Sequence, residues 1–152
     1  ALASYAVELV ELLVEEGESH PQIFELLCAF LDSLEQGGDA GSFRLLFELR
    51  LVYLLGYIPH LLHCSDCLKI FVDEPVRFDA ARGGCLCLQC AAASGFEVGL
   101  GTVGSLARTL KVGHREFAGF KFGQQTLDEG GRMLSQVINA VLPRPLKSVK
   151  FL

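Results

Sequence analysis

The chain has 152 residues, 51% of them hydrophobic, which suits one well-buried core and does not favour two separate domains. Its formal net charge of -5 at pH 7 argues against a surface that is basic throughout. The longest apolar stretch, residues 43–64, contains Arg44, Glu48 and Arg50, so we expect a buried helix there and no membrane-spanning segment. Arg44 and Glu48, four residues apart, predict an ordinary ion pair on a helix surface.

Charge is divided unevenly along the chain. Residues 1–63 hold ten acidic side chains against two arginines, whereas residues 102–152 hold three acidic side chains against eight basic ones. This polarity indicates an anionic partner for the C-terminal end, or else two ends that neutralise each other within the fold.

Apolar side chains recur at helical spacing in the first third of the chain. Residues 4–16 separate valines from glutamates at three- and four-residue spacing, which predicts an amphipathic helix. Residues 21–36 predict a second helix, with Cys28 as a buried, inert thiol on its apolar side. Residues 42–55 are apolar on nearly every side and close at Gly56, so we expect the central helix there.

The second half of the chain predicts shorter elements. Two helices are expected, a short one near residues 103–112 and a longer one near 124–142 that Gly130 and Gly131 weaken. Residues 93–104 read as a glycine-rich connection. Their GLGTVG run matches the GxGxxG pattern of dinucleotide sites, but it lacks the strand and the later acidic residue of that setting, so we reject a dinucleotide site.

Five of the six cysteines gather between residues 64 and 90. Cys64 and Cys67 form one CxxC pair, and Cys87 and Cys90 form a second pair after 19 further residues. Two such turns, brought together by a hairpin, present four thiolates to Zn(II) in a tetrahedral arrangement, so we predict a structural zinc site. Cys85 falls outside the CxxC spacing and is expected to be free.

The cysteine pattern does not indicate catalysis. A catalytic zinc keeps an open coordination position, and four cysteines leave none. The nucleobase deaminases, which also contain a CxxC pair, need an H-x-E sequence upstream. None of the histidines, His20, His60, His63 and His114, stands in that arrangement. We therefore expect a protein that is not an enzyme. His63 is adjacent to Cys64 in the sequence, but we do not expect it to bind the metal.

These elements predict a mainly α fold, a single domain of residues 1–152 in which a helical bundle carries an inserted lobe. The helical body comprises residues 1–63 and 91–152, and the lobe, a short β-hairpin between two metal-binding turns, comprises residues 64–90. Because CxxC spacing suits a metal better than disulfides, and no export signal is visible, we expect a cytoplasmic protein.

Three blocks of sequence resemble the C-terminal helical part of one family. They are FELRLVYLLGYIPHLLHCSDC at residues 47–67, FDAARGGCLCLQC at 78–90 and LPRPLKSVKFL at 142–152. In order and separation they are similar to the bacterial recombination-repair mediator RecO. The family pattern of two glycines, two variable residues and CxxC implies that Gly83 and Gly84 are the two glycines, and it places Cys85 at a variable position.

The resemblance implies a recombination mediator in DNA repair. Such proteins bind single- and double-stranded DNA, anneal complementary strands, contact RecR and the single-stranded-DNA-binding protein SSB, and help to load RecA. It also implies a nucleoid-associated, cytoplasmic location and an N-terminal OB-fold domain, which nothing in this sequence matches. The alternative is a zinc-stapled protein-interaction module without direct DNA binding, favoured by the net acidity and by the lack of a basic, aromatic stripe.

The C-terminal tail is a candidate contact site. Arg144, Lys147 and Lys150 recur every three residues, and Pro145 prevents the preceding helix from continuing. We expect the tail to fold back, bury its apolar side chains and present its three cations to DNA or to an acidic partner. The alternative is a solvated charge cluster that complements a helix dipole. The apolar side chains expected to be buried are Leu146, Val149 and Phe151.

A second contact site is expected around residues 60–64, HLLHC. Together with the nearly all-apolar helix before them, these residues predict a hydrophobic groove. The resemblance to RecO implies a receptor for the acidic, aromatic-tipped tail of SSB. Such a ligand needs an apolar pocket with a cation at its rim. We therefore expect the domain to bind that tail.

Overall fold

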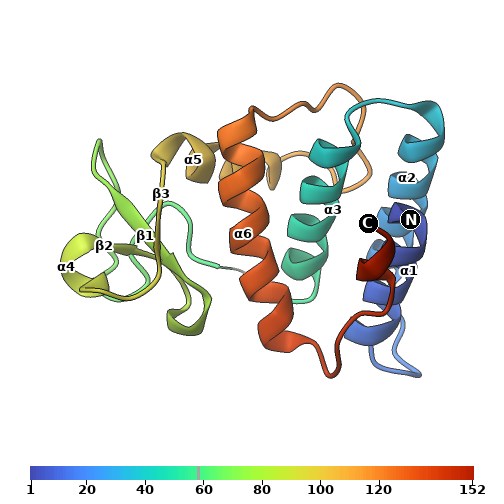
Figure 1. Cartoon of the computed structure of the whole chain (residues 1–152), viewed down its shortest axis with the longest axis horizontal. Helices are drawn as coiled ribbons and strands as arrows, with labels where there is room; N and C mark the ends of the chain where they lie inside the picture. Colours follow the sequence, from blue (N-terminus) through green and yellow to red (C-terminus); the bar gives the residue numbers. More distant parts are fainter. Residues whose placement is uncertain (58) are drawn as a thin grey trace.

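The computed structural model describes residues 1–57 and 59–152, and its fold is mainly helical with one small antiparallel sheet (Figure 1). The predicted fold class is thereby confirmed. The α-helices are α1 (Leu2–Leu13), α2 (Pro21–Gln36), α3 (Ala40–Leu54), α4 (Leu88–Ala91), α5 (Leu100–Thr109) and α6 (Gln124–Val141). The strands are β1 (Val76–Asp79), β2 (Gly84–Cys87) and β3 (Phe96–Val98), and the short 3-10 helices are η1 (Ala80–Arg82) and η2 (Ser148–Phe151).

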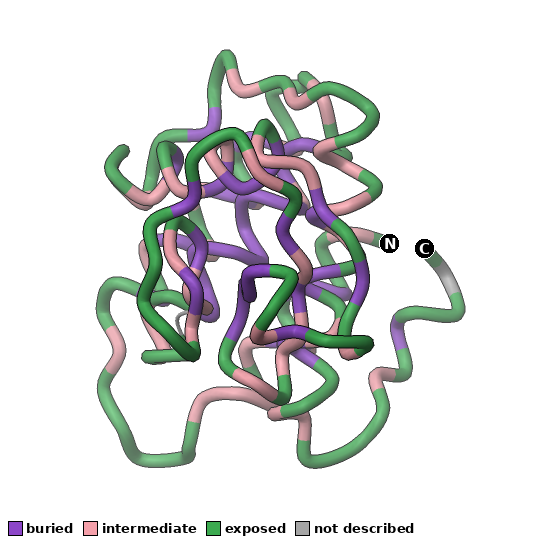
Figure 2. Tube along the Cα trace, turned by 90° about the vertical axis from the view of Figure 1, so that its left-hand side faces the viewer, coloured by how far each residue is buried: buried purple, intermediate pink, exposed green. Residues whose placement is uncertain are grey.

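Helix α3 is the central helix of the body, as its apolar sequence predicted. Between residues 42 and 52 only Arg44 is not buried. The helix packs against α2 on one side and α6 on the other (Figure 1). The rings of Phe30 and Phe47 stack with 4.6 Å between centroids, and Phe117 lies 5.8 Å from Phe30. Figure 2 shows the buried trace running through the interior, where removal of apolar surface from water stabilises the fold.

Helix α6 packs its apolar face on α3 through one of the two glycines that weaken its sequence. A Cβ on Gly130 would lie 3.0 Å from the Cδ2 atom of Leu45 on α3, whereas a Cβ on Gly131 would meet nothing within 4 Å. Gly130 therefore allows the two helices to approach, and the loss of helix propensity there is offset by packing.

The sheet belongs to the lobe, on the far side of α6 from α1 and α2 (Figure 1). Its strand order is β2-β1-β3, with Phe78 opposite Cys85 on one side and opposite Phe96 on the other. The hairpin between β1 and β2 was predicted. Strand β3 was not, because residues 96–98 were read as part of a glycine-rich connection; three residues are too few to show a period-two pattern by themselves.

Two expectations about the helices were wrong. Cys28 is exposed, because the buried face of α2 is formed by Ile23, Leu26 and Phe30, and a residue two positions after Leu26 lies about 200° around the helix from it. Glu48 is only 5% exposed, so its ion pair with Arg44 lies at the edge of the core and not on the helix surface.

Candidate metal centre

Four cysteine side chains converge in the lobe. The Sγ atoms of Cys64, Cys67, Cys87 and Cys90 all lie within 4.8 Å of one another, and those of Cys67 and Cys87 are 3.9 Å apart. A tetrahedral zinc ion with Zn–S bonds of about 2.3 Å needs sulfur separations of about 3.8 Å, so the donor set fits such an ion. In the described part of the chain, no other group of Cys, His, Asp or Glu side chains gathers in this way.

The two CxxC turns are built differently. Leu68 closes the first turn with a φ of 65° and donates its N–H to the carbonyl oxygen of Cys64 at 2.9 Å. Cys87 is the last residue of β2 and immediately precedes α4, which contains Cys90. The first turn is thus a loop, whereas the second is a junction between a strand and a short helix.

The surroundings of the thiols act differently on Cys64 and Cys90. Burial raises the pKa of the Cys64 thiol, but the backbone N–H groups of Cys67, Cys87 and Asp66 outweigh burial and bring this pKa to about 6. A hydrogen bond with Cys87 and burial raise the pKa of Cys90 to about 12. The cluster alone therefore favours a thiolate beside a protonated thiol. A divalent ion would bind all four cysteines as thiolates, so its binding would release the proton of Cys90.

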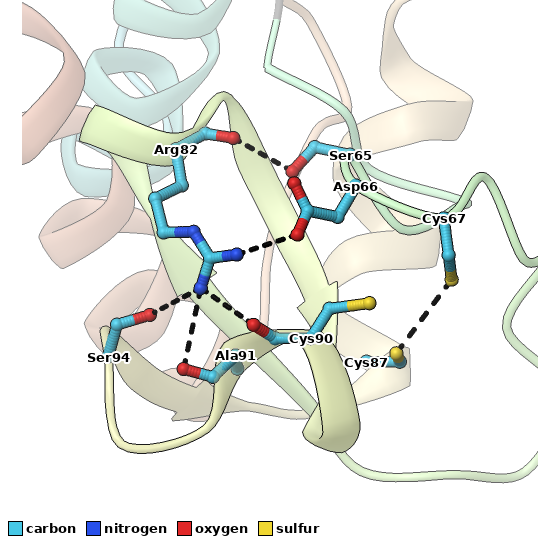
Figure 3. Close-up of polar contacts among 8 residues, drawn as sticks. All are labelled: Ser65, Asp66, Cys67, Arg82, Cys87, Cys90, Ala91 and Ser94. Atoms are coloured by element: carbon cyan, nitrogen blue, oxygen red, sulfur yellow. Dashed lines mark hydrogen bonds and ion pairs between the residues drawn. The ribbon is translucent and has the colours of Figure 1, made fainter.

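Arg82 joins the two cysteine turns (Figure 3). Its Nη2 atom donates to the Asp66 carboxylate at 2.7 Å, and its Nη1 atom donates to the Cys90 carbonyl at 2.7 Å and to the Ser94 hydroxyl at 3.2 Å. The Arg82 carbonyl in turn accepts a hydrogen bond from the Ser65 hydroxyl at 2.8 Å. One side chain thus connects the segment between the first two cysteines with the segment after the last.

Three residues near the cluster are not part of the four-sulfur group. Cys85 is fully buried outside the four-sulfur group, and burial raises the pKa of its thiol to about 12. The imidazole of His63 lies 2.7 Å from that of His60, between Nε2 and Nδ1. Lys69 pairs with Glu74 at 2.8 Å. The structure therefore leaves Cys85 and His63 outside the cluster, where the sequence placed them.

The lobe is attached to the helical body by backbone pairing. His60 donates its N–H to the Gly83 carbonyl at 3.0 Å, and its own carbonyl accepts the N–H of Cys85 at 2.8 Å. Gly84, between them, has a φ of 132°, and a Cβ there would lie 2.5 Å from the His60 nitrogen. Only glycine meets both conditions at this position.

The C-terminal tail folds back onto α1. The carboxylate of Glu8 accepts the backbone N–H groups of Lys147 and Ser148 at 2.7 and 2.8 Å, and it lies 3.8 Å from Arg144. The side chains of Lys147 and Lys150 are exposed. Contrary to expectation, Val149 is 50% exposed. The turn is fixed by the hydrogen bonds from the backbone of Lys147 and Ser148 to Glu8, which we call the Glu8 clasp, and not by an apolar contact of Val149. Leu146 is half-buried as expected, and the side chain of Phe151 lies outside the described residues.

A cavity of about 530 Å³ opens between α1, α3, α6 and the tail. At its edge the Tyr5 hydroxyl donates to the Glu48 carboxylate at 2.6 Å, and the Arg44 Nε donates to the same carboxylate at 3.0 Å. Burial raises the pKa of Glu48 against the opposing effect of these two donors. Sequence reasoning missed this polar group because Tyr5 lies 43 residues before its partner.

Sequence reasoning also missed the segment between α5 and α6. Together with Arg108 in the last turn of α5 it presents four exposed cations, and residues 115–122, REFAGFKF, interleave basic and aromatic side chains. The expected lack of a basic, aromatic stripe did not take this run into account, although the run is present in the sequence. The four cations are Arg108, Lys111, Arg115 and Lys121.

The fold and the cluster define a class of protein, a mainly helical domain whose inserted lobe can hold a tetrahedrally bound metal ion. The family model described as Recombination protein O C terminal matches residues 1–150. The chain belongs to the RecO family.

Two proteins named DNA repair protein RecO are similar to all or nearly all of the chain. The protein of Syntrophotalea carbinolica is 47% identical over 155 residues, covering 100% of this chain and 59% of the relative. That of Geobacter sulfurreducens is 39% identical over 148 residues, covering 97% of this chain and 60% of the relative. The chain thus spans about 60% of the length of these curated relatives. Among the helices of the described residues, none is both long and apolar enough to cross a membrane.

Proposed function

We propose that the chain acts in DNA repair as the C-terminal part of a recombination mediator, without catalysing a reaction itself. In this role it binds DNA, assists the annealing of complementary strands and, through protein partners that include RecR, helps to load RecA in the bacterial cytoplasm. The observation that carries the proposal is the family match over residues 1–150 together with relatives whose name includes DNA repair.

The metal proposed for the four cysteines is Zn(II). Sulfur-rich tetrahedral sets favour this ion, and four protein ligands leave no position for a substrate or a reactive water. When bound, the ion supplies a cross-link between the two CxxC turns. Residues of the chain support that cross-link in two ways. Arg82 already joins the same two turns by hydrogen bonds, and backbone N–H groups favour the thiolate form of Cys64.

The proposed site for the acidic, aromatic-tipped tail of SSB is the cavity between α1, α3, α6 and the tail. Its lining combines apolar side chains, among them Leu45, Leu127 and Ile138, with the 40% exposed side chain of Arg44. An apolar pocket with a cation at its edge suits such a ligand. The expected groove at residues 60–64 is less suitable, because Leu61 and Cys64 are buried.

The tail cations remain candidates for a DNA contact. Lys147 and Lys150 project from a turn that Glu8 holds in place, whereas Arg144 is partly neutralised by Glu8. We therefore expect the two lysines to contribute more than the arginine to any phosphate contact.

Anisotropy of labelled oligonucleotides tests the proposed function. The zinc-loaded chain should bind single- and double-stranded DNA saturably, and its affinity should fall as salt rises, because phosphate contacts release counterions. A folded, zinc-loaded chain that binds an SSB tail peptide and no DNA would instead be a zinc-stapled interaction module, the reading that the net charge of -5 favours.

A peptide titration tests the partner site. Arg44→Gln should weaken binding of the SSB tail peptide, whereas Lys69→Gln, which changes a lysine in the lobe, should leave it unchanged. No saturable binding by the folded parent chain would argue decisively against this partner.

A further inference from the structure

Positive charge without an ion-pair partner gathers in the last turn of α5 and in the connection from α5 to α6. The α5–α6 segment, residues 108–122, contains four exposed basic side chains and one acidic residue, Glu116. None of the four forms an ion pair with any residue that the structure describes. In a chain with a net charge of -5, this segment is a local exception. Figure 1 shows it as the gold-to-orange connection from α5 to the start of α6.

Arg50 of α3 holds this segment in place. Its side chain is buried, and its Nη1 atom donates to the carbonyl oxygen of Glu116 at 2.6 Å and to that of His114 at 3.4 Å. Its guanidinium carbon lies 5.1 Å from the ring centroid of Phe117 and 5.5 Å from that of Phe120. The segment has little regular structure, yet it is anchored before any ligand arrives, which lowers the entropy lost on binding.

Two cavities lie beside the cations. A cavity of about 200 Å³ is lined by Arg108, Val112, Phe120 and Phe122, and the two phenylalanine rings are 6.4 Å apart. Both rings are half-buried, so part of each remains accessible. A cavity of about 230 Å³, lined partly by Arg50, Lys111 and His114, adjoins the same segment.

We propose that the α5–α6 segment is a contact surface for single-stranded DNA, with its cations on the phosphates and a base against Phe120 and Phe122. Single-strand binding surfaces combine a track of positive charge with aromatic rings on which bases stack. An acidic peptide would use the cations, and only one with an aromatic tip would also contact the rings, so the acidic peptide is an outcome that the test below separates from DNA. The inference rests on the proposed DNA-binding function and names a surface separate from Arg144, Lys147 and Lys150.

Two charge-neutralised variants separate this surface from the tail. The first carries Arg108→Gln, Lys111→Gln, Arg115→Gln and Lys121→Gln, and the second carries Arg144→Gln, Lys147→Gln and Lys150→Gln. Circular dichroism and zinc content confirm that each remains folded, and anisotropy of a labelled oligothymidine is measured over a range of salt. The first variant should lose about 0.7 from the magnitude of the salt slope for each phosphate contact removed. Its loss per charge should exceed that of the tail variant.

The outcomes are distinct. Unchanged affinity and slope in the first variant, with a parent that binds DNA, would overturn this surface and leave the proposed function standing. A parent that does not bind DNA would overturn both. Lost binding of an acidic peptide with retained DNA binding would make the segment a protein-contact surface instead.

Stacking is tested with Phe122→Leu, which keeps an apolar side chain and removes the ring. Its affinity for oligothymidine should fall about fivefold or more, as expected for one lost stacked base. Its affinity for an abasic strand of the same length should match the parent's. An equal fall on both strands would show that the ring only supports the segment, and no fall on either strand would overturn the base contact.

Discussion

The carboxylate of Glu8 accepts the backbone N–H of Ser148 at 2.8 Å across 140 residues of sequence, and this bond holds the C-terminal turn against the first helix. The second oxygen of the same carboxylate accepts the N–H of Lys147 at 2.7 Å. A backbone clasp of this kind fixes the position of the tail without burying its lysine side chains, which remain exposed.

The clasp predicts a pH dependence. Hydrogen bonds from Ser148 and Lys147 lower the pKa of Glu8 from its ordinary value of 4.5 to about 2. The stabilisation is therefore fully present above pH 4.5 and is lost as the pH falls toward 2. Thermal unfolding of the parent and of Glu8→Gln should differ most above this window and converge within it.

Glu11→Gln is the control for that comparison, because Glu11 is an exposed residue of the same helix. It should follow the parent at every pH. A difference between Glu8→Gln and the parent that does not shrink on acidification would contradict the proposed clasp.

Cysteine substitutions test the ligand set. Metal analysis should find the one zinc ion per chain that we propose in the parent and none in Cys87→Ser, because a tetrahedral structural site needs all four ligands. Cys85→Ser should retain the ion, since Cys85 lies outside the sulfur group, although its buried position predicts some loss of stability. The reverse pattern would refute the assignment. Chelation should loosen residues 64–90 and leave the separately packed helices folded, as hydrogen exchange can measure.

Arg82→Lys tests the connection between the two cysteine turns. Lysine keeps the charge but cannot reach Asp66, Cys90 and Ser94 together, because it lacks the planar fork of donors. Zinc affinity, measured by competition with a coloured chelator, should fall about 10- to 100-fold, as for other groups that orient metal ligands. Arg115→Lys, at an exposed position, should leave zinc affinity unchanged; equal affinities in the two variants would exclude a role for Arg82.

The adjacent glycines of α6 predict opposite effects. Gly131→Ala should raise the free energy of unfolding by about 0.5–1 kcal/mol, because alanine favours the helix and its Cβ meets nothing within 4 Å. Gly130→Ala should not show this increase, because its Cβ would press on Leu45. Its free energy of unfolding should be about 1 kcal/mol or more below that of Gly131→Ala. Urea unfolding measures both, and equal stabilities would mean that α3 and α6 adjust without cost.

The features that the sequence predicted are those that residues close together in the chain determine. The apolar run of α3 has no polar face to expose, so its central position follows from its composition. The CxxC pairs bring two sulfurs together within each turn. Only the meeting of the two turns depended on the fold, and the hairpin between them made that meeting predictable.

The features that sequence missed depend on distant partners. Glu8 and Ser148, or Tyr5 and Glu48, have no local pattern that marks them as pairs. Strand β3 exists because β1 offers it a free edge, as three residues carry too little pattern to predict a strand.

The two ends of the chain lie side by side in both views, next to the Glu8 clasp (Figures 1 and 2). A short linker from Leu152 to Ala1 would therefore close the chain into a ring with little strain, and proteins with neighbouring termini tolerate such permutation. Gly17, in the exposed connection between α1 and α2, is a suitable place to open that ring. In a permuted chain that begins at Glu18, α1 comes directly after the tail, so the hydrogen bonds of Glu8 to Lys147 and Ser148 join residues that are close in sequence.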